Sequence, residues 1–318
     1  MTPVIAILIP CYNEARTIAK VVTEFRAALP GATAYVYDNN STDGTAEIAR
    51  AAGAVVRAET LQGKGNVVRR MFADVEADIY LLVDGDDTYP AEAAPRLIAA
   101  LTGQHLDMVN GSRVPDQAAA HRFGHAFGNR LLTGLVGRIF GARLHDMLSG
   151  YKVLSRRFVK SFPCLATGFE IETELTVHAL ELRMPILEMP IAYRERPAGS
   201  VSKLHTIRDG IRILWTILRL VQVERPLQFF GAAGFALLAA AIIVMIPVFA
   251  TFEATGLVPR LPTAVLATGM TLLGFLSLAC GLILETVTLG RLEAKRMVYL
   301  GIGSCAPQAA APGEDRGG

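Results

Sequence analysis

The chain has 318 residues and a formal net charge of +2 at pH 7, which is too small to predict nucleic-acid binding. Hydrophobic residues make up 52% of it, a high share for a purely soluble protein, and the excess is concentrated after residue 226. The four cysteines are scattered without C-x-x-C spacing, which argues against a zinc site and gives no disulfide framework. The chain begins with an apolar run rather than a basic stretch and a cleavage site, so we expect no signal peptide.

Short apolar runs alternate with helical patterns from residue 4 onward. The predicted strands cover residues 4–9, 34–37, 54–56 and 79–83. Strands that alternate with helices predict an α/β fold, in which a mainly parallel sheet is covered on both faces. Ligands of such sheets bind beyond the carboxyl ends of the strands, and polar loops fall at those ends in this sequence.

The fourth apolar run leads into three carboxylates, Asp84, Asp86 and Asp87, which are interrupted only by Gly85. Side chains alternate along an extended strand, so Asp84 and Asp86 are expected to project to the same side. Two hard oxygen donors at the exposed end of a buried strand suit a divalent ion that binds a diphosphate. A solvated acidic turn is the alternative, but the strand and the flanking phosphate-compatible loops favour the metal site.

Three other polar positions are candidates for a nucleotide pocket. Asp38 comes first after the second strand and could accept hydrogen bonds from a base or ribose, whereas residues 41–43 could equally cap the next helix. Lys64 lies between two glycines and could add positive charge beside a phosphate, although the Walker A spacing is missing. Glu14 is either a pocket residue or an ordinary acid of the first helical turn.

Taken in order, these segments resemble the family 2 inverting glycosyltransferases with the Rossmann-like GT-A fold. The segments are P-C-Y-N-E at 10–14, D-N-N-S-T-D-G-T at 38–45, G-K-G at 63–65 and D-G-D at 84–86. Later segments resemble the polyprenyl-phosphate branch, which includes dolichol-phosphate mannose synthase and bactoprenol glucosyltransferases. They are G-S-R at 111–113, D-M-L-S-G-Y-K at 146–152, G-F-E at 168–170 and R-P-A-G-S-V-S-K at 196–203. The resemblance covers about residues 4–300.

Two positions depart from the commonest pattern of that family. Asn39 and Asn40 replace a second acid after Asp38, which leaves open the base of the sugar donor. Lys152 stands where many relatives carry arginine, which keeps the charge but loses a bidentate phosphate contact.

The resemblance implies a complete set of site residues. The nucleotide-diphosphate sugar is expected to contact Pro10, Tyr12, Glu14, Asp38, Lys64 and Asp84, and Mg²⁺ or Mn²⁺ to be held by Asp84, Asp86 and Asp87. The predicted catalytic residues are Asp86, Asp146 and Arg113: the metal would stabilise the leaving nucleotide, and Asp146 would orient the acceptor or take a residual proton. Arg130, Ser149 and Lys152 are predicted to contact the acceptor phosphate. Arg130 belongs to an arginine-rich stretch whose basic face could instead be solvated or face anionic lipid.

The C-terminal third predicts membrane attachment. An amphipathic basic pattern in residues 204–226 predicts an interfacial helix, although it could instead pack against its own catalytic domain. Two uncharged runs then predict transmembrane helices at about 227–250 and 262–286. Basic residues flank both outer sides, which predicts a multi-pass protein of the inner membrane with its catalytic domain and both termini in the cytoplasm.

These patterns divide the chain into four predicted parts. They are a catalytic domain at 1–203, the interfacial helix at 204–226, a two-helix transmembrane domain at 227–300 and a disordered tail at 301–318. Glycines in both spans would allow close helix contact within one chain or between subunits of a homo-oligomer.

Together, the patterns and the resemblance predict an inverting hexosyltransferase. It would move a sugar from a nucleotide-diphosphate donor to polyprenyl phosphate for cell-envelope glycan synthesis. The family branch suggests a UDP-linked hexose, with GlcNAc, galacturonate and mannose as alternatives. The alternatives are an inactive nucleotide-binding membrane scaffold and a transferase with another acceptor. A processive polysaccharide synthase is disfavoured because the sequence has no Q-x-x-R-W motif.

Overall fold

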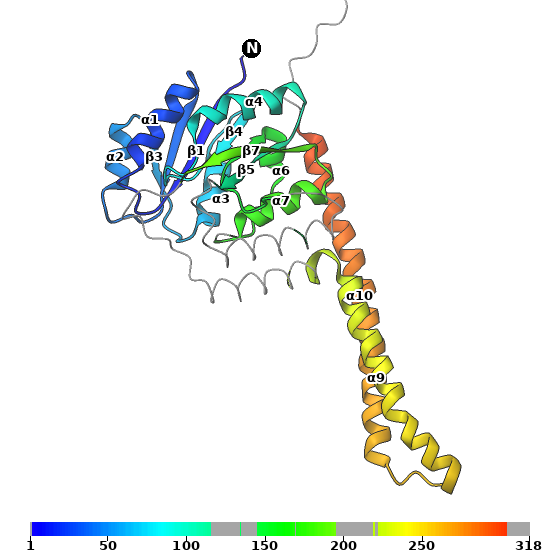
Figure 1. Ribbon diagram of the computed structural model, residues 1–318. Helices are drawn as coiled ribbons and strands as arrows, with labels where there is room; N and C mark the ends of the chain where they lie inside the picture. The colour runs from blue at the N-terminus through cyan, green and yellow to red at the C-terminus, as the bar shows by residue number, and fades with distance from the viewer. Residues whose placement is uncertain are drawn as a thin grey trace, which may run out of the picture. The chain divides into compact units, whose positions relative to one another are not determined.

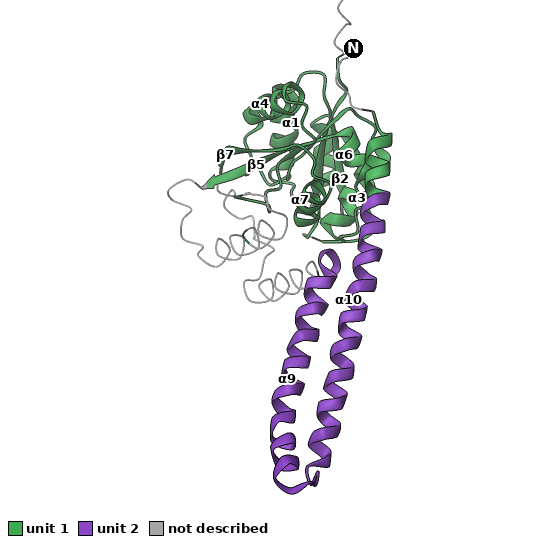
Figure 2. Cartoon of the chain, turned by 90° about the vertical axis from the view of Figure 1, so that its right-hand side faces the viewer, with its two compact units in different colours: residues 1–207, 295–318 green, residues 208–294 purple. Residues whose placement is uncertain are grey.

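The computed structural model describes residues 2–115, 134, 145–168, 170–194, 219 and 222–303 (Figure 1). They form two units, which comprise residues 1–207 with 295–318 and residues 208–294 (Figure 2). Most of the predicted interfacial helix and nearly all of the predicted disordered tail lie outside the described residues, so both stay predictions.

A seven-stranded sheet organises the described part of the first unit, in the order β3-β2-β1-β4-β6-β5-β7. Its strands are β1 Ile5–Cys11, β2 Thr33–Asp38, β3 Val55–Ala58, β4 Ile79–Leu82, β5 Met108–Pro115, β6 Lys152–Ser155 and β7 Ile186–Tyr193. Neighbouring strands are parallel except for the two pairs that involve β6. The predicted α/β fold with a mainly parallel sheet is therefore confirmed, and the four predicted strands correspond to β1–β4.

Helices cover both faces of this sheet (Figure 1). They are α1 Ile18–Ala28, α2 Thr45–Ala51, α3 Lys64–Asp74, the 3₁₀ turn η1 Ala91–Ala93, α4 Ala94–Gly103, α6 Arg156–Ser161 and α7 Ile171–Glu181. Helix α1 packs with α2 and α4, whereas α3 packs with α7. Strand β1 is buried on both sides, because Ile7 and Ile9 join the core beneath α1 and the alternate residue Leu8 is equally buried.

The strand register brings the predicted site loops to one edge of the sheet. Across β1 and β2, Cys11 pairs with Asp38, and across β1 and β4, Leu8 pairs with Leu82. The polar segments that follow β1, β2 and β4 therefore begin at neighbouring strand ends, as the alternating pattern predicts. This edge carries the candidate site.

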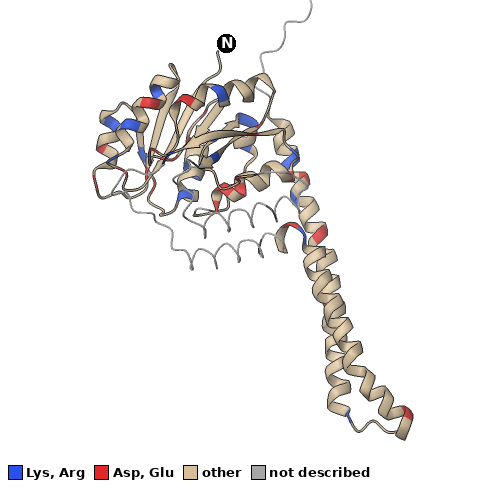
Figure 3. Cartoon of the chain, in the orientation of Figure 1, with Lys and Arg blue, Asp and Glu red and all other residues tan. Residues whose placement is uncertain are grey.

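The second unit consists, in its described part, of α9 Pro226–Thr255 and most of α10 Leu261–Gly301. Both helices are long and apolar enough to be candidate membrane spans. Charged residues are sparse along α9 and the first part of α10 and gather toward the end of α10, from Glu285 onward (Figure 3). Gly234 and Gly274 allow a close approach, because a Cβ at Gly234 would lie 2.9 Å from the Gly274 carbonyl oxygen. The absence of side chains at these glycines lets α9 and α10 pack closely within one chain, as the glycine pattern predicts.

Helix α10 continues beyond its predicted span, and from residue 295 it belongs to the first unit. Lys295 forms an ion pair with Glu181 at 2.7 Å, and the Tyr299 hydroxyl donates to Asp107 at 2.7 Å. The guanidinium of Arg157 lies 5.1 Å from the centre of the Tyr299 ring. Residues 295–303 are therefore packed against the sheet domain, an attachment that the sequence pattern did not indicate.

Candidate active site

The acidic turn, residues 84–87, begins with a carboxylate that is paired with a buried lysine. The Lys64 ammonium lies 2.5 Å from Asp84 and 2.6 Å from Glu172, which is 108 residues distant in the chain. Burial alone would lower the pKa of Lys64, but the carboxylates of Asp84 and Glu172 outweigh that effect and raise it. The lysine therefore stays charged at this edge of the sheet.

Two glycines let separate loops converge on this turn. A Cβ at Gly150 would collide with the carboxylate of Asp84, and a Cβ at Gly85 would lie 2.7 Å from the Glu14 carboxylate. Side chains at either position would push the segments apart. The predicted residues Glu14 and Asp84 are thus brought together, and the loop that ends at Gly150 touches the same turn.

The other two carboxylates of the acidic turn have different partners. Asp86 is buried and accepts hydrogen bonds from the Thr88 hydroxyl at 2.6 Å and the Thr88 amide at 3.3 Å. Asp87 lies 2.5 Å from Lys20 of α1. Within the part of the chain that the structure describes, no three His, Cys, Asp or Glu side chains group closely enough to hold a metal together. The predicted set of three metal ligands therefore stays a prediction.

Asp38 has a buried oxygen suited to a ligand. Its Oδ2 accepts a hydrogen bond from the Ser41 amide at 3.1 Å, whereas its Oδ1 is buried without a partner among the described residues. An unpaired buried acceptor is costly, so an incoming N–H or O–H donor would be favoured there. The contact between Asp38 and a base or ribose stays a prediction.

The neighbouring Asn39 explains one departure from the family pattern. Its amide nitrogen donates to the carbonyl oxygens of Glu59 and Leu61 at 2.8 and 2.9 Å, and its Oδ1 accepts from the Gly63 amide at 2.8 Å. An ionised carboxylate could not donate to those carbonyls. Asn39 therefore connects the loop after β2 to the loop after β3.

Residues 41–45 serve the loop after β1 rather than an outside ligand. The Ser41 hydroxyl accepts from the Asn13 amide, and Thr45 accepts from the Glu14 amide, both at 2.8 Å. Asp43 binds the Ala15 amide at 3.0 Å. These contacts give the cluster a structural role, although it differs from the predicted one, because the N-cap of α2 is Gly44 and has no side-chain hydrogen bond.

The predicted residues Pro10 and Tyr12 lie where that loop begins. Pro10 is buried inside β1, opposite Tyr37 of β2, and Tyr12 follows the strand with 37% of its surface exposed. Tyr12 is thus accessible to a ligand, whereas Pro10 shapes the strand end.

The glycines beside Lys64 allow close backbone packing. A Cβ at Gly63 would collide with the carbonyl oxygen of Thr167, and one at Gly65 with that of Ala166. The small size of these glycines lets segment 166–167 lie against the start of α3.

Asp146 and Arg113 form the centre of a second cluster beside the acidic turn. Arg113 Nε and Nη2 donate to the two oxygens of Asp146 at 2.7 and 2.8 Å, and its backbone amide donates at 3.1 Å. Burial would lower the pKa of the guanidinium, but its hydrogen bonds to Asp146 raise it. Two of the three residues predicted as catalytic thus form a charged bidentate pair.

Ser149 and Lys152, which were predicted to contact an acceptor phosphate, have partners inside the protein. Both side chains are fully buried. Ser149 donates to the Gly111 carbonyl at 2.5 Å, and Lys152 donates to Asn110 at 2.6 Å. They support the 145–150 loop from inside the protein, and their contact with an acceptor phosphate stays a prediction. Arg130 lies outside the described residues.

Glu188 and Asn110 are site residues that sequence reasoning missed. Glu188 Oε1 accepts from the Asp146 amide at 2.9 Å and from Asn110 at 3.2 Å, and its Oε2 accepts from the amide and Nδ1 of His145 at 2.8 and 2.9 Å. Asn110 also donates to the Asp146 carbonyl at 2.7 Å. A lone acid within the otherwise uncharged strand 186–193 was the available signal.

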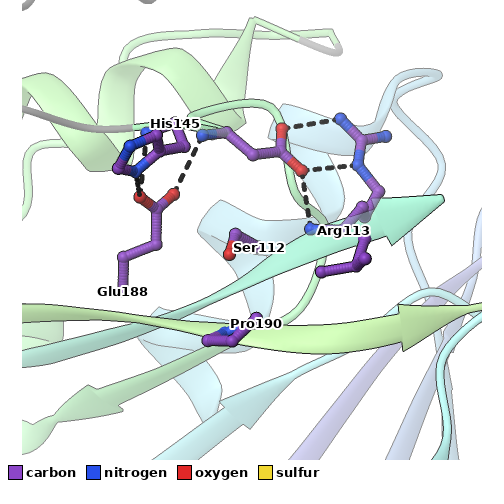
Figure 4. Close-up of a pocket in the computed structure, with 7 residues that line it drawn as sticks. Ser112, Arg113, His145, Glu188 and Pro190 are labelled. Carbon is purple, nitrogen blue, oxygen red and sulfur yellow. Dashed lines mark hydrogen bonds and ion pairs between the residues drawn. The ribbon is translucent and has the colours of Figure 1, made fainter.

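A cleft of about 600 Å³ opens beside this cluster (Figure 4). Its lining residues are Ser112, Arg113, Val114, His145, Asp146, Glu188 and Pro190. They come from β5, β7 and the 145–150 loop, whose far end meets Asp84 at Gly150. The cleft and the acidic turn are therefore joined by one short segment of chain.

Comparison with known proteins places these features in a wider context. A model of the family described as glycosyl transferase family 2 matches residues 6–162. The chain is 37% identical over 235 residues to glycosyltransferase AglJ of Haloferax volcanii, an alignment that covers 73% of this chain and 77% of that protein. It is 30% identical over 222 residues to a dolichyl-phosphate hexose transferase of the same organism, with 70% and 95% covered.

A solved structure shares the fold. Glucosyl-3-phosphoglycerate synthase from Mycobacterium tuberculosis, in a complex with Mn²⁺, UDP-glucose and glycerol 3-phosphate, superposes with a TM-score of 0.56 at 24% identity. The match covers 68% of this chain and 80% of that one. It supports the GT-A-like architecture of the sheet domain.

Proposed function

The chain belongs to glycosyl transferase family 2, and from that premise we propose that it transfers a hexose from a UDP-linked donor to polyprenyl phosphate. The observation that carries the proposal is the contact between Gly150 and Asp84, because it joins a diphosphate-compatible turn to a cleft with a bidentate Arg113–Asp146 pair. A sugar held at the turn would then face an acceptor held in the cleft.

The donor nucleotide is assigned to the loops after β1 and β2. Asp38 offers a buried unpaired oxygen to an N–H or O–H donor of the nucleoside. Tyr12, which directly follows the neighbouring strand β1, is exposed. Glu14 and Lys64 complete the pocket near the acidic turn, where the diphosphate would bring negative charge toward the lysine.

The proposal includes Mg²⁺ or Mn²⁺, for which Asp84 and Asp86 supply hard oxygen ligands. This position already attracts a cation, because the Lys64 ammonium lies 2.5 Å from Asp84. Asp87 would coordinate the ion, as predicted, only after its ion pair with Lys20 breaks. When bound, the ion would stabilise the charge on the leaving nucleoside diphosphate.

The acceptor is assigned from the apolar helices and from the relatives. Helices α9 and α10 would hold the enzyme in the inner membrane as a multi-pass protein with its catalytic unit and termini in the cytoplasm, and one relative is a dolichyl-phosphate hexose transferase. An oxygen of the acceptor phosphate would attack C1 of the sugar while the bond from C1 to the nucleoside diphosphate breaks. This direct displacement inverts the anomeric centre and gives a lipid-phosphate-sugar for cell-envelope glycan synthesis.

Asp146 fits an orienting role better than that of a strong base. A phosphate monoester has a second pKa of about 6 and is largely ionised at neutral pH, so little proton removal is required. Asp146 is also held by both arms of Arg113, which stabilises its ionised form. We therefore assign the Arg113–Asp146 pair to acceptor positioning.

The test uses purified protein in detergent with undecaprenyl phosphate, Mg²⁺ or Mn²⁺, and a panel of nucleotide sugars. We expect a lipid-phosphate-sugar product from one donor, abolished by EDTA and lowered roughly 10²–10³-fold in Asp86→Asn. Glu47→Gln, an exposed acid-to-amide change on α2, is the matched control.

Two results would contradict this function. Nucleotide binding without turnover of any donor would favour a membrane scaffold. Turnover only with a water-soluble alcohol would favour a transferase with another acceptor.

A further inference from the structure

His145 lies at the mouth of the cleft in an arrangement that no role above uses. Its imidazole Nδ1 and its backbone amide both bind Glu188 Oε2, at 2.9 and 2.8 Å (Figure 4). The His145 side chain is 86% exposed, whereas that of Glu188 is 11% exposed. A buried carboxylate thus holds an exposed imidazole in one orientation.

This contact fixes which nitrogen faces outward. When Nδ1 donates its hydrogen to Glu188, an added proton goes to Nε2, which makes no hydrogen bond within the described part of the chain. The imidazolium then offers an N–H and a positive charge to a molecule in the cleft. Glu188 is itself anchored by the Asp146 amide and Asn110, so the orientation does not depend on a mobile partner.

The other charges that line the cleft favour a positive charge on the imidazole of His145. Arg113 is paired with Asp146, and the remaining acid that lines the cleft is Glu188. Ser112, Val114 and Pro190 are uncharged. Without a proton on His145, the described lining carries one more negative than positive charge, which disfavours a dianionic ligand.

We propose that His145, oriented by Glu188, binds the phosphate group of the acceptor as an imidazolium. The inference rests on the proposed function and deepens it, because it names a contact that selects a phosphate-bearing acceptor over an alcohol. Protonation of His145 brings the described lining to neutrality and adds a charge-assisted hydrogen bond to a phosphate oxygen. The carboxylate–imidazole arrangement also resembles a general-base pair, which a hydroxyl acceptor would require.

The binding experiment compares His145→Gln and His145→Lys with the wild-type protein in detergent. The probes are farnesyl phosphate and uncharged farnesol. We expect His145→Gln to weaken farnesyl phosphate binding about tenfold without changing farnesol binding, because one charge-assisted hydrogen bond is lost. His145→Lys should restore part of the affinity. His105→Asn, at an exposed histidine whose φ of 51° asparagine tolerates, is the control.

Steady-state kinetics with undecaprenyl phosphate provide the second arm. His145→Gln should raise the acceptor KM about tenfold while leaving kcat and the donor KM nearly unchanged. Unchanged phosphate affinity in His145→Gln would overturn the proposal. A large fall in kcat at constant acceptor KM, not rescued by lysine, would overturn it in favour of a general base.

Failure of the proposed function has a different signature. If the wild-type protein produces no lipid-linked sugar but binds farnesyl phosphate through His145, the transfer reaction is wrong and the phosphate contact stands. If the product forms and His145→Gln changes neither farnesyl phosphate binding nor the acceptor KM, the transfer reaction stands and the contact is wrong.

Discussion

Each half of the candidate site contains a lysine with little or no exposed surface, and the two lysines have opposite surroundings. In the donor half, formed by β1–β4 and their loops, Lys64 lies between the carboxylates of Asp84 and Glu172. In the acceptor half, formed by β5–β7 and the 145–150 loop, Lys152 donates to Asn110, the Met147 carbonyl and Thr176, all of which are uncharged. The pKa of Lys64 is raised, whereas burial lowers that of Lys152 to about 8.

The difference shows that burial lowers the pKa of a lysine unless neighbouring carboxylates outweigh it. The donor half keeps a charged network at the position to which we assign the metal and the diphosphate. The acceptor half uses its lysine to hold Asn110, which in turn holds the Asp146 carbonyl at 2.7 Å. One lysine lies in the proposed binding machinery, and the other supports it from behind.

The largest effect is expected from Lys64→Met. This change leaves Asp84 and the buried Glu172 without their cation, so the free energy of unfolding should fall by about 3–5 kcal/mol. The urea midpoint of the protein in detergent measures it. The double variant Lys64→Met/Glu172→Gln should recover much of the stability and little activity. A Lys64→Met protein that unfolds at the wild-type urea concentration would contradict the charged network.

Lys152→Met tests the other half through its pH dependence. The pKa of Lys152 is about 8 in the folded protein and 10.5 as the ordinary value, so between these pH values the unfolded chain binds more protons. Wild-type stability should therefore rise with pH from 8 to 10.5, by about 3 kcal/mol at most. Subtracting the urea-unfolding free energy of Lys152→Met removes the contribution of other groups. If the difference in unfolding free energy between the two proteins stays flat or falls over this range, the pKa of Lys152 is not lowered in the folded protein.

Arg113→Lys sharpens the comparison at the cleft. Lysine keeps the charge but loses the fork that binds both oxygens of Asp146 at 2.7 and 2.8 Å. We expect kcat/KM for the lipid acceptor to fall roughly 10–100-fold, which corresponds to the loss of one hydrogen bond to a charged group. The donor KM should change little. Arg96→Lys, at an exposed arginine of α4, is the control, and an equal loss in both variants would contradict the role of the fork.

The donor half could be predicted from sequence far better than the acceptor half. Its strands are apolar runs that end in polar loops, so the positions of Asp38 and Asp84 at one sheet edge follow from the alternation of strands and helices. The pairing of Lys64 with Glu172 could not be predicted, because a separation of 108 residues leaves no local pattern. Lys152 looked like a ligand contact, since a sequence shows charge but not burial.

The acceptor half depends on long-range strand pairing. Strand β6 has only four residues and runs antiparallel between β4 and β5, so no repeat in the sequence marks it. On the other side of β5, the edge strand β7 places Glu188 opposite Asn110. That register brings a lone acid under the 145–150 loop, and only the folded sheet shows it.

The smallest effect is expected at the base of the acceptor half, where Asp107 precedes β5. This fully buried acid accepts hydrogen bonds from Ser155, Arg157 and Tyr299 at 2.6, 2.5 and 2.7 Å. Tyr299→Phe removes one of three donors while the ring contact with Arg157 remains. The two other donors keep the charge compensated, so the free energy of unfolding should fall by only about 1 kcal/mol.

The control for Tyr299→Phe is Met297→Ala, at a side chain of the same helical turn that is 74% exposed and should have no effect on the urea midpoint. Combining Tyr299→Phe with Asp107→Asn should produce less than the sum of the two single losses, because both changes remove the same hydrogen bond. Additive losses would mean that the end of α10 contributes to the catalytic unit through other contacts. In that case the end of α10 would be held by other side chains of the helix and not by the hydrogen bond from Tyr299 to Asp107.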